Sequence, residues 1–347
     1  MGPKDKEATS RRLESICQER LHAIVTSSEE PCSVDGTALR DRLTEELSII
    51  KKRSLTEVFL LLYDCIVPVA NRYPVTVRGR AGASFIIWLF GLCHYNPMRF
   101  GTEPEIFFGD YDNEDDPEVP LYFDFNIPEK VKRDAVERIA DHLEVILPKE
   151  MQKSMDDRRV LQINLRTACR SGNNVSCDEE TTHLGEALKI DITHPDWKNM
   201  KKGSVISLYI HTDMDGLSKL AELSGIVPQN PEKDIRTFSL FTPEKAEGLG
   251  LYGTKYIRDN VLAYEQPEKL EDLIKVLALT QGLGDRMMSQ IHMIQAGTIG
   301  FDDVVATVED LNGDRNGIVY AFSAVHIAEY AWIALALAWY RVRSGVS

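Results

Sequence analysis

Strand-like segments in this sequence lie between two groups of helix-like segments, and this order limits the folds that the chain can adopt. Apolar side chains recur at three- and four-residue spacing, as in amphipathic helices, at 6–25, 36–52 and 55–71. Apolar runs rich in β-branched and aromatic residues, typical of strands, follow at 119–125, 160–165 and 204–210. From about Thr242 onward the helical pattern returns. The sequence therefore predicts an α/β core flanked by helical segments.

A glycine turn joins the first helical group to the strands. The short run at 73–77 is β-branched but contains Pro74, which favours an edge strand. The turn at 78–82 (RGRAG) follows it, and the apolar run at 83–93 predicts a buried helix.

Further elements are predicted after the strand at 119–125. Residues 128–147 show helical spacing, with Pro128 in the first turn. The polar stretch at 169–186 is interpreted as a loop. Residues 324–340 are apolar, but His326 and Glu329 interrupt them, so a buried helix is favoured over a membrane anchor.

Length and cysteine usage are those of an intracellular globular protein. A chain of 347 residues with 43% hydrophobic composition can bury one large core or two modest ones. The six cysteines are scattered without a CxxC pair, and the polar N-terminus has no secretory signal pattern. We therefore expect a cytoplasmic protein with no membrane partner.

The charge balance disfavours one class of function. The formal net charge is -14, and broad binding to a phosphate backbone depends on an excess of cations. A local basic groove remains compatible with this balance. The segment at 109–118 carries six carboxylates in ten residues, which predicts a solvated loop, with metal capture as the alternative.

A set of short motifs occurs in a fixed order along the chain. The segment RGRAGASF at 78–85 is followed by Asn96 and Pro97, and the other segments lie at 16–20, 43–47, 119–125, 223–226, 252–258, 296–299 and 322–330. In this order the motifs resemble the palm and adjoining fingers of PolC-type bacterial DNA polymerase III alpha subunits, which are C-family DNA polymerases. The segment at 78–85 is similar to that family's glycine- and serine-rich segment, and Asn96 and Pro97 to its trailing Asn-Pro.

The resemblance covers roughly residues 10–343 and implies an architecture. It implies a helical lead-in at 1–72, a palm-like α/β domain with a mixed, nucleotidyltransferase-like sheet at 73–241, and a helical, fingers-like region at 242–347. It also implies that strands 119–125 and 204–210 lie side by side in one sheet, with the turn at 78–82 at its rim.

The catalytic carboxylates that the family uses are missing here. Polymerase chemistry requires clustered acids that hold two divalent cations. The resemblance places two of them at alternate residues after Pro120, where this chain has Leu121 and Phe123, and leaves Asp124 as the remaining acid. The third position falls on Ser207 or Tyr209. We therefore expect a degenerate, catalytically inactive homologue that binds nucleic acid, nucleotide or a replication protein.

The residues at the turn to which the resemblance assigns nucleotide binding form a candidate phosphate site. Guanidinium groups and backbone amides at a helix N-terminus are suited to phosphate. The candidates are Arg78, Gly79, Arg80, Gly82, Ser84 and, in the fingers-like helix, His326. The alternative is that the glycines are kept for the turn and that His326 is a core histidine.

Two other functions are open. Asp213 and Asp215 form a DxD after a strand, and with Asp124 they would bind Mg²⁺ in an active nucleotidyltransferase whose acids have moved. The simpler interpretation of the DxD is a helix N-cap. The other alternative is a protein-interaction scaffold without nucleic-acid binding, which the acidic charge favours. No cofactor is expected, except Mg²⁺ under the alternative with relocated acids.

Overall fold

The computed structural model describes most of the chain as two compact units. It describes residues 3–26, 35–109, 121–144, 160–167, 174–182, 185–194, 204–281, 285–304 and 324–344. The first unit is Met1–Asp215 and the second is Gly216–Ser347. The predicted division into a helical lead-in, a palm-like domain and a fingers-like region stays a prediction. Most of the acidic segment, residues 110–118, lies outside the described residues.

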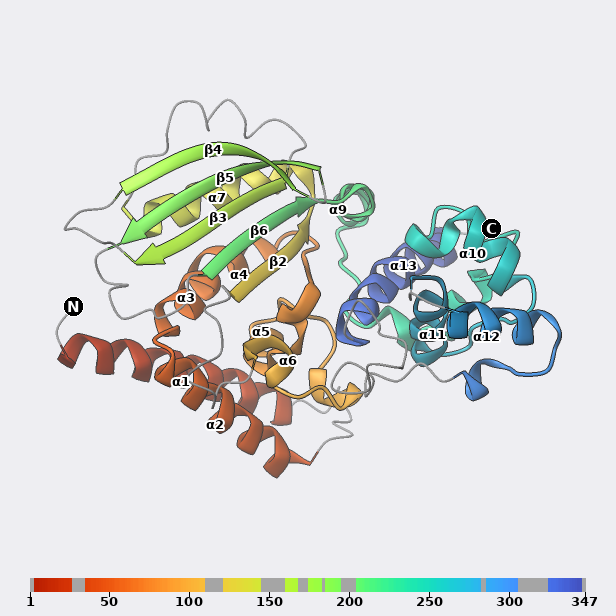
Figure 1. Cartoon of the computed structure of the whole chain (residues 1–347), viewed down its shortest axis with the longest axis horizontal. Helices are drawn as coiled ribbons and strands as arrows, with labels where there is room; N and C mark the ends of the chain where they lie inside the picture. Colours follow the sequence, from red (N-terminus) through yellow and green to blue (C-terminus); the bar gives the residue numbers. More distant parts are fainter. Residues whose placement is uncertain are drawn as a thin grey trace. The chain divides into compact units, whose positions relative to one another are not determined.

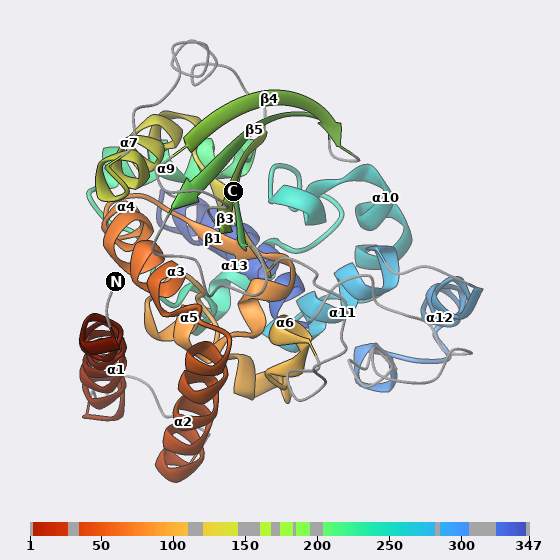
Figure 2. The same ribbon diagram turned by 60° about the vertical axis from the view of Figure 1, so that its left-hand side comes forward.

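The N-terminal helices follow the predicted spans closely. They are α1 (Pro3–Thr26), α2 (Gly36–Lys52) and α3 (Thr56–Leu61), which continues through a π-helical turn (Leu62–Ile66) into α4 (Val67–Ala70). Pro68 has no N–H to donate back along the helix, which explains the wider turn just before it. In Figures 1 and 2, α1 and α2 lie on the far side of α3 from the sheet.

A six-stranded mixed sheet forms the centre of the first unit. Its strands are β1 (Thr76–Arg78), β2 (Leu121–Ile127), β3 (Val160–Thr167), β4 (Asn174–Thr182), β5 (Gly185–His194) and β6 (Ser204–Ile210). Their order is β1-β2-β6-β3-β5-β4, with β2 parallel to β6 and β3 parallel to β5. The predicted α/β class with a mixed sheet, the edge strand before the glycine turn and the pairing of β2 with β6 are confirmed. The edge strand itself is Thr76–Arg78 and not 73–77.

One predicted loop is wrong. The stretch at 169–186 contains β4 and the start of β5, which pair antiparallel from Asn174 opposite Thr193 to Thr182 opposite Gly185. The β4 sequence, NVSCDEETT, has little apolar content, so its composition resembles that of a loop. Because β4 is the outer strand of the sheet, its ladder with β5 does not require an apolar run.

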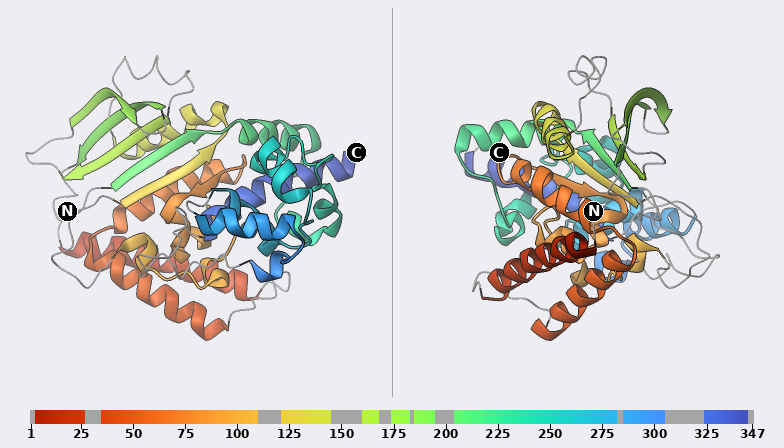
Figure 3. Two further views of the ribbon diagram at one scale, coloured as in Figure 1. Left: turned by 45° about the vertical axis from the view of Figure 1, so that its right-hand side comes forward. Right: turned by 90° about the vertical axis from the view of Figure 1, so that its left-hand side faces the viewer.

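One face of the sheet packs on aromatic helices. Phe123 of β2 is fully buried, and its ring lies 5.5 Å from that of Phe59 on α3 and 5.3 Å from that of Phe107 on α6 (Glu105–Phe108), both edge to face. Each such buried side chain contributes about 1.5–3 kcal/mol. Figures 1 and 3 show α7 (Lys132–His142) on the same face as α3.

The helices around this core differ in length from the predictions. The run at 83–93 is buried as predicted, but its helix, α5, covers only Phe85–Leu89. Gly91, two residues after the helix, has φ +74°, the left-handed conformation that ends helices. The predicted helix at 128–147 begins with a 3₁₀ turn (Glu129–Val131) before α7, and the description stops at Glu144.

The second unit is helical, and α9 (Thr212–Ser224) leads into it. Its helices are α10 (Lys255–Ile257) with a π-helical turn (Arg258–Leu262), α11 (Leu270–Gln281), α12 (Asp285–Gln295) and α13 (Ala324–Ser344). Short 3₁₀ turns occur at Pro97–Phe100 in the first unit and at Pro231–Lys233, Ile235–Leu240, Gly250–Gly253 and Phe301–Asp303 in the second. The predicted buried helix is confirmed in α13, where Ala331 and Leu335 are fully buried. Among the helices described, none is both long and apolar enough to span a membrane.

Candidate functional site

A row of polar residues crosses the sheet on the face opposite the aromatic core. Arg78 of β1 pairs with Asp124 of β2, Asp124 pairs with Ser207 of β6, and Ser207 pairs with Gln162 of β3. Because side chains alternate along a strand, Asp124 points away from the side where Phe123 is buried. We call these four residues the polar row. In the polar row, Asp124, the acid that remains where the resemblance expects the catalytic acids of this strand, lies opposite Arg78.

Arg78 covers a tyrosine from the neighbouring part of the same face. Its Cζ lies 4.1 Å from the ring centroid of Tyr209, which is 8% exposed. Burial raises the pKa of the Tyr209 phenol, and the charge of Asp124 raises it further, whereas Arg78 opposes both effects. Tyr209 therefore stays neutral and acts as a surface on which the Arg78 cation is held.

Residues at the start of α9 lie within the electrostatic reach of Arg78. Burial lowers the pKa of His211, and the positive charge of Arg78 lowers it further. The negative charges of Asp213 and Asp215 raise this pKa and so oppose both effects. Burial raises the pKa of Asp213, whose Oδ2 lies 3.7 Å from His211 Nδ1. Asp215 accepts a hydrogen bond from the Glu129 N–H at 2.7 Å and so ties α9 to the turn after β2.

The glycine turn begins directly after Arg78. Residues Gly79–Ala83 form a 3₁₀ turn, and Gly79 has φ +66°, which favours glycine over any residue with a side chain. A Cβ at Gly79 would lie 3.5 Å from Asp124 Oδ2, so the turn passes close to the acid. Arg80 is exposed and Gly82 is buried.

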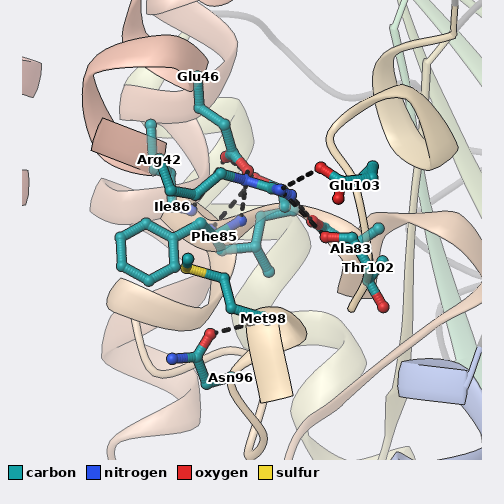
Figure 4. A network of polar contacts seen from close by, with 11 residues as sticks. Arg42, Glu46, Ala83, Phe85, Ile86, Asn96, Met98, Thr102 and Glu103 are labelled. Atoms are coloured by element: carbon teal, nitrogen blue, oxygen red, sulfur yellow. Dashed lines mark hydrogen bonds and ion pairs between the residues drawn. The ribbon is translucent and has the colours of Figure 1, made fainter. Parts of the chain in front are cut away.

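A buried ion pair on α2 holds the far end of this turn (Figure 4). Glu46, which is fully buried, accepts hydrogen bonds from Arg42 Nε at 2.9 Å, from the Phe85 N–H at 2.7 Å and from the Ser84 hydroxyl at 2.8 Å. Arg42 in turn donates to the Ala83 carbonyl at 3.0 Å. Burial raises the pKa of Glu46, and Arg42 with these hydrogen bonds opposes the shift. The Ser84 hydroxyl also accepts from the Ile87 N–H at 3.4 Å and so caps α5.

Comparison with known proteins agrees with part of the resemblance. Residues 11–152 match the model of the bacterial DNA polymerase III alpha NTPase domain. That region includes α2, the glycine turn and β2, and therefore Glu46, Arg78 and Asp124. No curated protein matches the chain. The likeness to DNA polymerase III alpha is thus supported over the first part of the first unit.

In this polymerase III alpha-like region, the two faces of β2 determine which positions could place a carboxylate beside Asp124. Leu121 and Phe123, where the resemblance suggested alternate aspartates, are 6% and 0% exposed on the core side of β2. An acid at Phe123 would lie among aromatic rings. The positions that share a face with Asp124 are Tyr122 and Asn126, and neither is an acid.

The proposed relocation of the acids is not accompanied by a ligand cluster in the described residues. Within the described parts of the chain, no three Asp, Glu, His or Cys side chains are grouped so that they could hold a metal ion. Asp213 and Asp215 both fall in the first turn of α9, where acids interact favourably with the helix dipole. An Mg²⁺ site at Asp124, Asp213 and Asp215 stays a prediction.

The remaining predicted site residue lies in the second unit. His326 on α13 is 3% exposed, and its ring centroid is 5.1 Å from that of Tyr330. It is buried as expected of a core histidine, and its proposed role towards nucleotide stays a prediction.

The Arg42–Glu46 pair and the contact between Arg78 and Tyr209 were not predicted from the sequence. Arg42 and Glu46 are four residues apart and directly precede the apolar residues Leu43 and Leu47, and this pattern was a usable signal for a buried pair. The Arg78 contact depends on the order of strands in the sheet, and no local pattern specifies it.

Proposed function

We propose that this chain is a catalytically inactive, PolC-type relative of the DNA polymerase III alpha NTPase domain that binds nucleic acid or nucleotide through Arg78 and Arg80. The match over residues 11–152 supports the relationship. The single observation that carries the functional part is the position of Arg78 directly across from Asp124.

The neighbours of Asp124 favour an anion over a pair of metal ions. Two-metal catalysis needs several carboxylates around two cations. On its two flanking strands Asp124 has Arg78 and Ser207, one a fixed cation and the other neutral. A guanidinium group at that position repels a divalent cation and attracts a phosphate oxygen.

The binding is expected to be weak and sensitive to salt. Arg78 lies over the ring of Tyr209 and opposite the carboxylate residue Asp124, and Arg80 is exposed to screening by ions. We expect the backbone amides of Gly79 and Gly82 to assist the two arginines. Two phosphate contacts correspond to a slope of about -1.8 in a plot of log affinity against log salt.

Fluorescence anisotropy with labelled primer-template DNA across a salt series tests this function. The Arg78→Ala/Arg80→Ala variant should bind much more weakly than the wild type and should lose most of the salt dependence. A matched control is Arg11→Ala/Arg133→Ala, which removes the same charge from side chains that are 71% and 43% exposed elsewhere in the first unit. The control should bind like the wild type.

Three outcomes would contradict the proposal. Equal titration curves for wild type and Arg78→Ala/Arg80→Ala would mean that the turn is kept for folding alone. Equal losses in the test and control variants would mean that only net charge matters. No binding even at low salt would favour the interaction scaffold instead.

A further inference from the structure

Tyr122 exposes its ring on the same face of the sheet as the polar row. It is 45% exposed, although Leu121 and Phe123 on either side of it are almost completely buried. Tyr209 is on this face too, but it is 8% exposed and Arg78 covers it. Among the described residues of β1, β2 and β6, Tyr122 is therefore the aromatic side chain most accessible to a ligand.

The ring stands close to the proposed anion site. Tyr122 and Asp124 are two residues apart on one strand face, a separation of about 7 Å. Because β1 runs antiparallel to β2, the chain that continues beyond Arg78 leads toward the Tyr122 end of β2. Arg80, which is exposed, lies in that continuing segment.

We propose that Tyr122 stacks on a base of single-stranded nucleic acid whose phosphates contact Arg78 and Arg80. This inference rests on the proposed function and adds the ligand class to it. Proteins that bind single strands without sequence preference combine cations for the backbone with aromatic rings for the bases. A phosphate polymer without bases would use the arginines alone, whereas a single strand would use both groups.

A structural role for Tyr122 makes a different prediction. Tyrosine is common in strands, and an exposed one can serve only to stabilise the sheet. Replacement by valine keeps the strand preference and removes the ring, and replacement by phenylalanine keeps the ring and removes the hydroxyl. These two variants separate stacking from strand formation.

The test compares two anionic probes on the full chain. Affinity for labelled oligothymidylate is measured by anisotropy, and inorganic polyphosphate is added as the competitor to obtain its own affinity. We expect Tyr122→Val to bind the oligonucleotide about tenfold more weakly, within the range for one lost stacked base, and to bind polyphosphate like the wild type. Tyr122→Phe should bind both probes like the wild type. Tyr264→Ala, which alters a tyrosine 51% exposed in the second unit, is the control and should change neither affinity.

The outcomes distinguish this inference from the function on which it rests. Equal oligonucleotide affinity for Tyr122→Val and wild type, with the Arg78→Ala/Arg80→Ala loss intact, overturns stacking and leaves anion binding in place. Equal losses for both probes in Tyr122→Val overturn stacking as well, because they show that the ring supports the turn. No binding of either probe by the wild type overturns both proposals. If Tyr122→Val does not unfold cooperatively like the wild type, Tyr122→Thr replaces it.

Discussion

The guanidinium group of Arg78 lies over the ring of Tyr209, with its Cζ 4.1 Å from the ring centroid, while its own strand partner is Asp124. The cation therefore lies over an aromatic ring of β6, and the residue opposite it on β2 carries a carboxylate. Burial and the Asp124 charge both raise the pKa of the Tyr209 phenol, so the ring remains neutral near pH 7. This arrangement places a permanent cation opposite the acid that the resemblance retains in β2.

The first prediction concerns catalysis. Purified protein with Mg²⁺, primed template and deoxynucleoside triphosphates should extend the primer no faster than buffer alone, because Arg78 and Ser207 flank the single acid Asp124. Gel analysis of labelled primer measures this. Extension that Asp213→Ala or Asp215→Ala abolishes would establish the relocated acids and remove the proposal of inactivity.

The second prediction concerns the buried ion pair of α2. Glu46→Ala should lower the free energy of unfolding by about 3–5 kcal/mol, because it leaves the Arg42 charge and the Phe85 N–H buried without their acceptor. Urea unfolding followed by circular dichroism gives this value. The control is Glu7→Ala, because Glu7 forms an exposed i, i+4 ion pair with Arg11. This substitution should change the free energy of unfolding by less than about 0.5 kcal/mol.

A loss below about 1 kcal/mol for Glu46→Ala would show that the pair is not needed to hold the turn. Replacement of both members by apolar residues, Arg42→Met/Glu46→Leu, should cost less than Glu46→Ala alone, because no buried charge is then left.

The third prediction concerns the glycine turn. Gly79→Ala should destabilise the protein by about 1–2 kcal/mol, because alanine is disfavoured at φ +66°. It should also weaken DNA binding by moving Arg78 and Arg80. Gly216→Ala should have the opposite effect on stability, because Gly216 lies within α9 and a Cβ there would contact no atom outside its own helix within 4 Å. This substitution should stabilise the protein by about 0.4–1 kcal/mol. Thermal unfolding of both variants compares them, and a stabilising Gly79→Ala would contradict the assigned turn.

The fourth prediction concerns thiol chemistry. Burial raises the pKa of Cys17 from 9.0 to about 12, and the pKa of Cys65 is also raised to about 12 by burial. Both thiols should therefore react slowly with iodoacetamide at pH 8 in the native protein and rapidly in urea, as site-resolved mass spectrometry can measure. Because each thiol binds its proton more tightly when folded, stability should fall as pH rises from about 9 towards 12. Fast native alkylation of Cys17 would show that α1 is loosely held.

The sequence specified the helices and the central strand pair better than the surroundings of the site. Residues 36–52 match α2 because the apolar spacing was clear and Asp35 supplies an N-cap, its side chain accepting from the Thr37 N–H at 3.1 Å. The outer strand β4 was missed because its sequence is polar and its pairing with β5 is what makes it a strand.

The sequence named Arg78 and Asp124 as candidates and Ser207 as a position where an acid is missing, and the register brings these three residues into one row. Their role as a binding site stays a prediction. The face that each residue of β2 occupies was not predictable, since a shift of one residue exchanges the two faces. Leu121 and Phe123 were singled out because the resemblance places acids at these positions, and the exposed Tyr122 between them was not predicted to matter.

Glu46 belongs to α2, yet it completes the first turn of α5, about forty residues further along the chain, by accepting from the N–H groups of Phe85 and Ile86. The N-terminus of α5 therefore has no complete set of acceptors within its own segment. A truncated protein that starts after Lys52 would expose these donors and leave the glycine turn without its anchor. Expression of a shortened form should accordingly begin before Gly36, and any natural exchange of segments that preserves the turn must carry α2 with it.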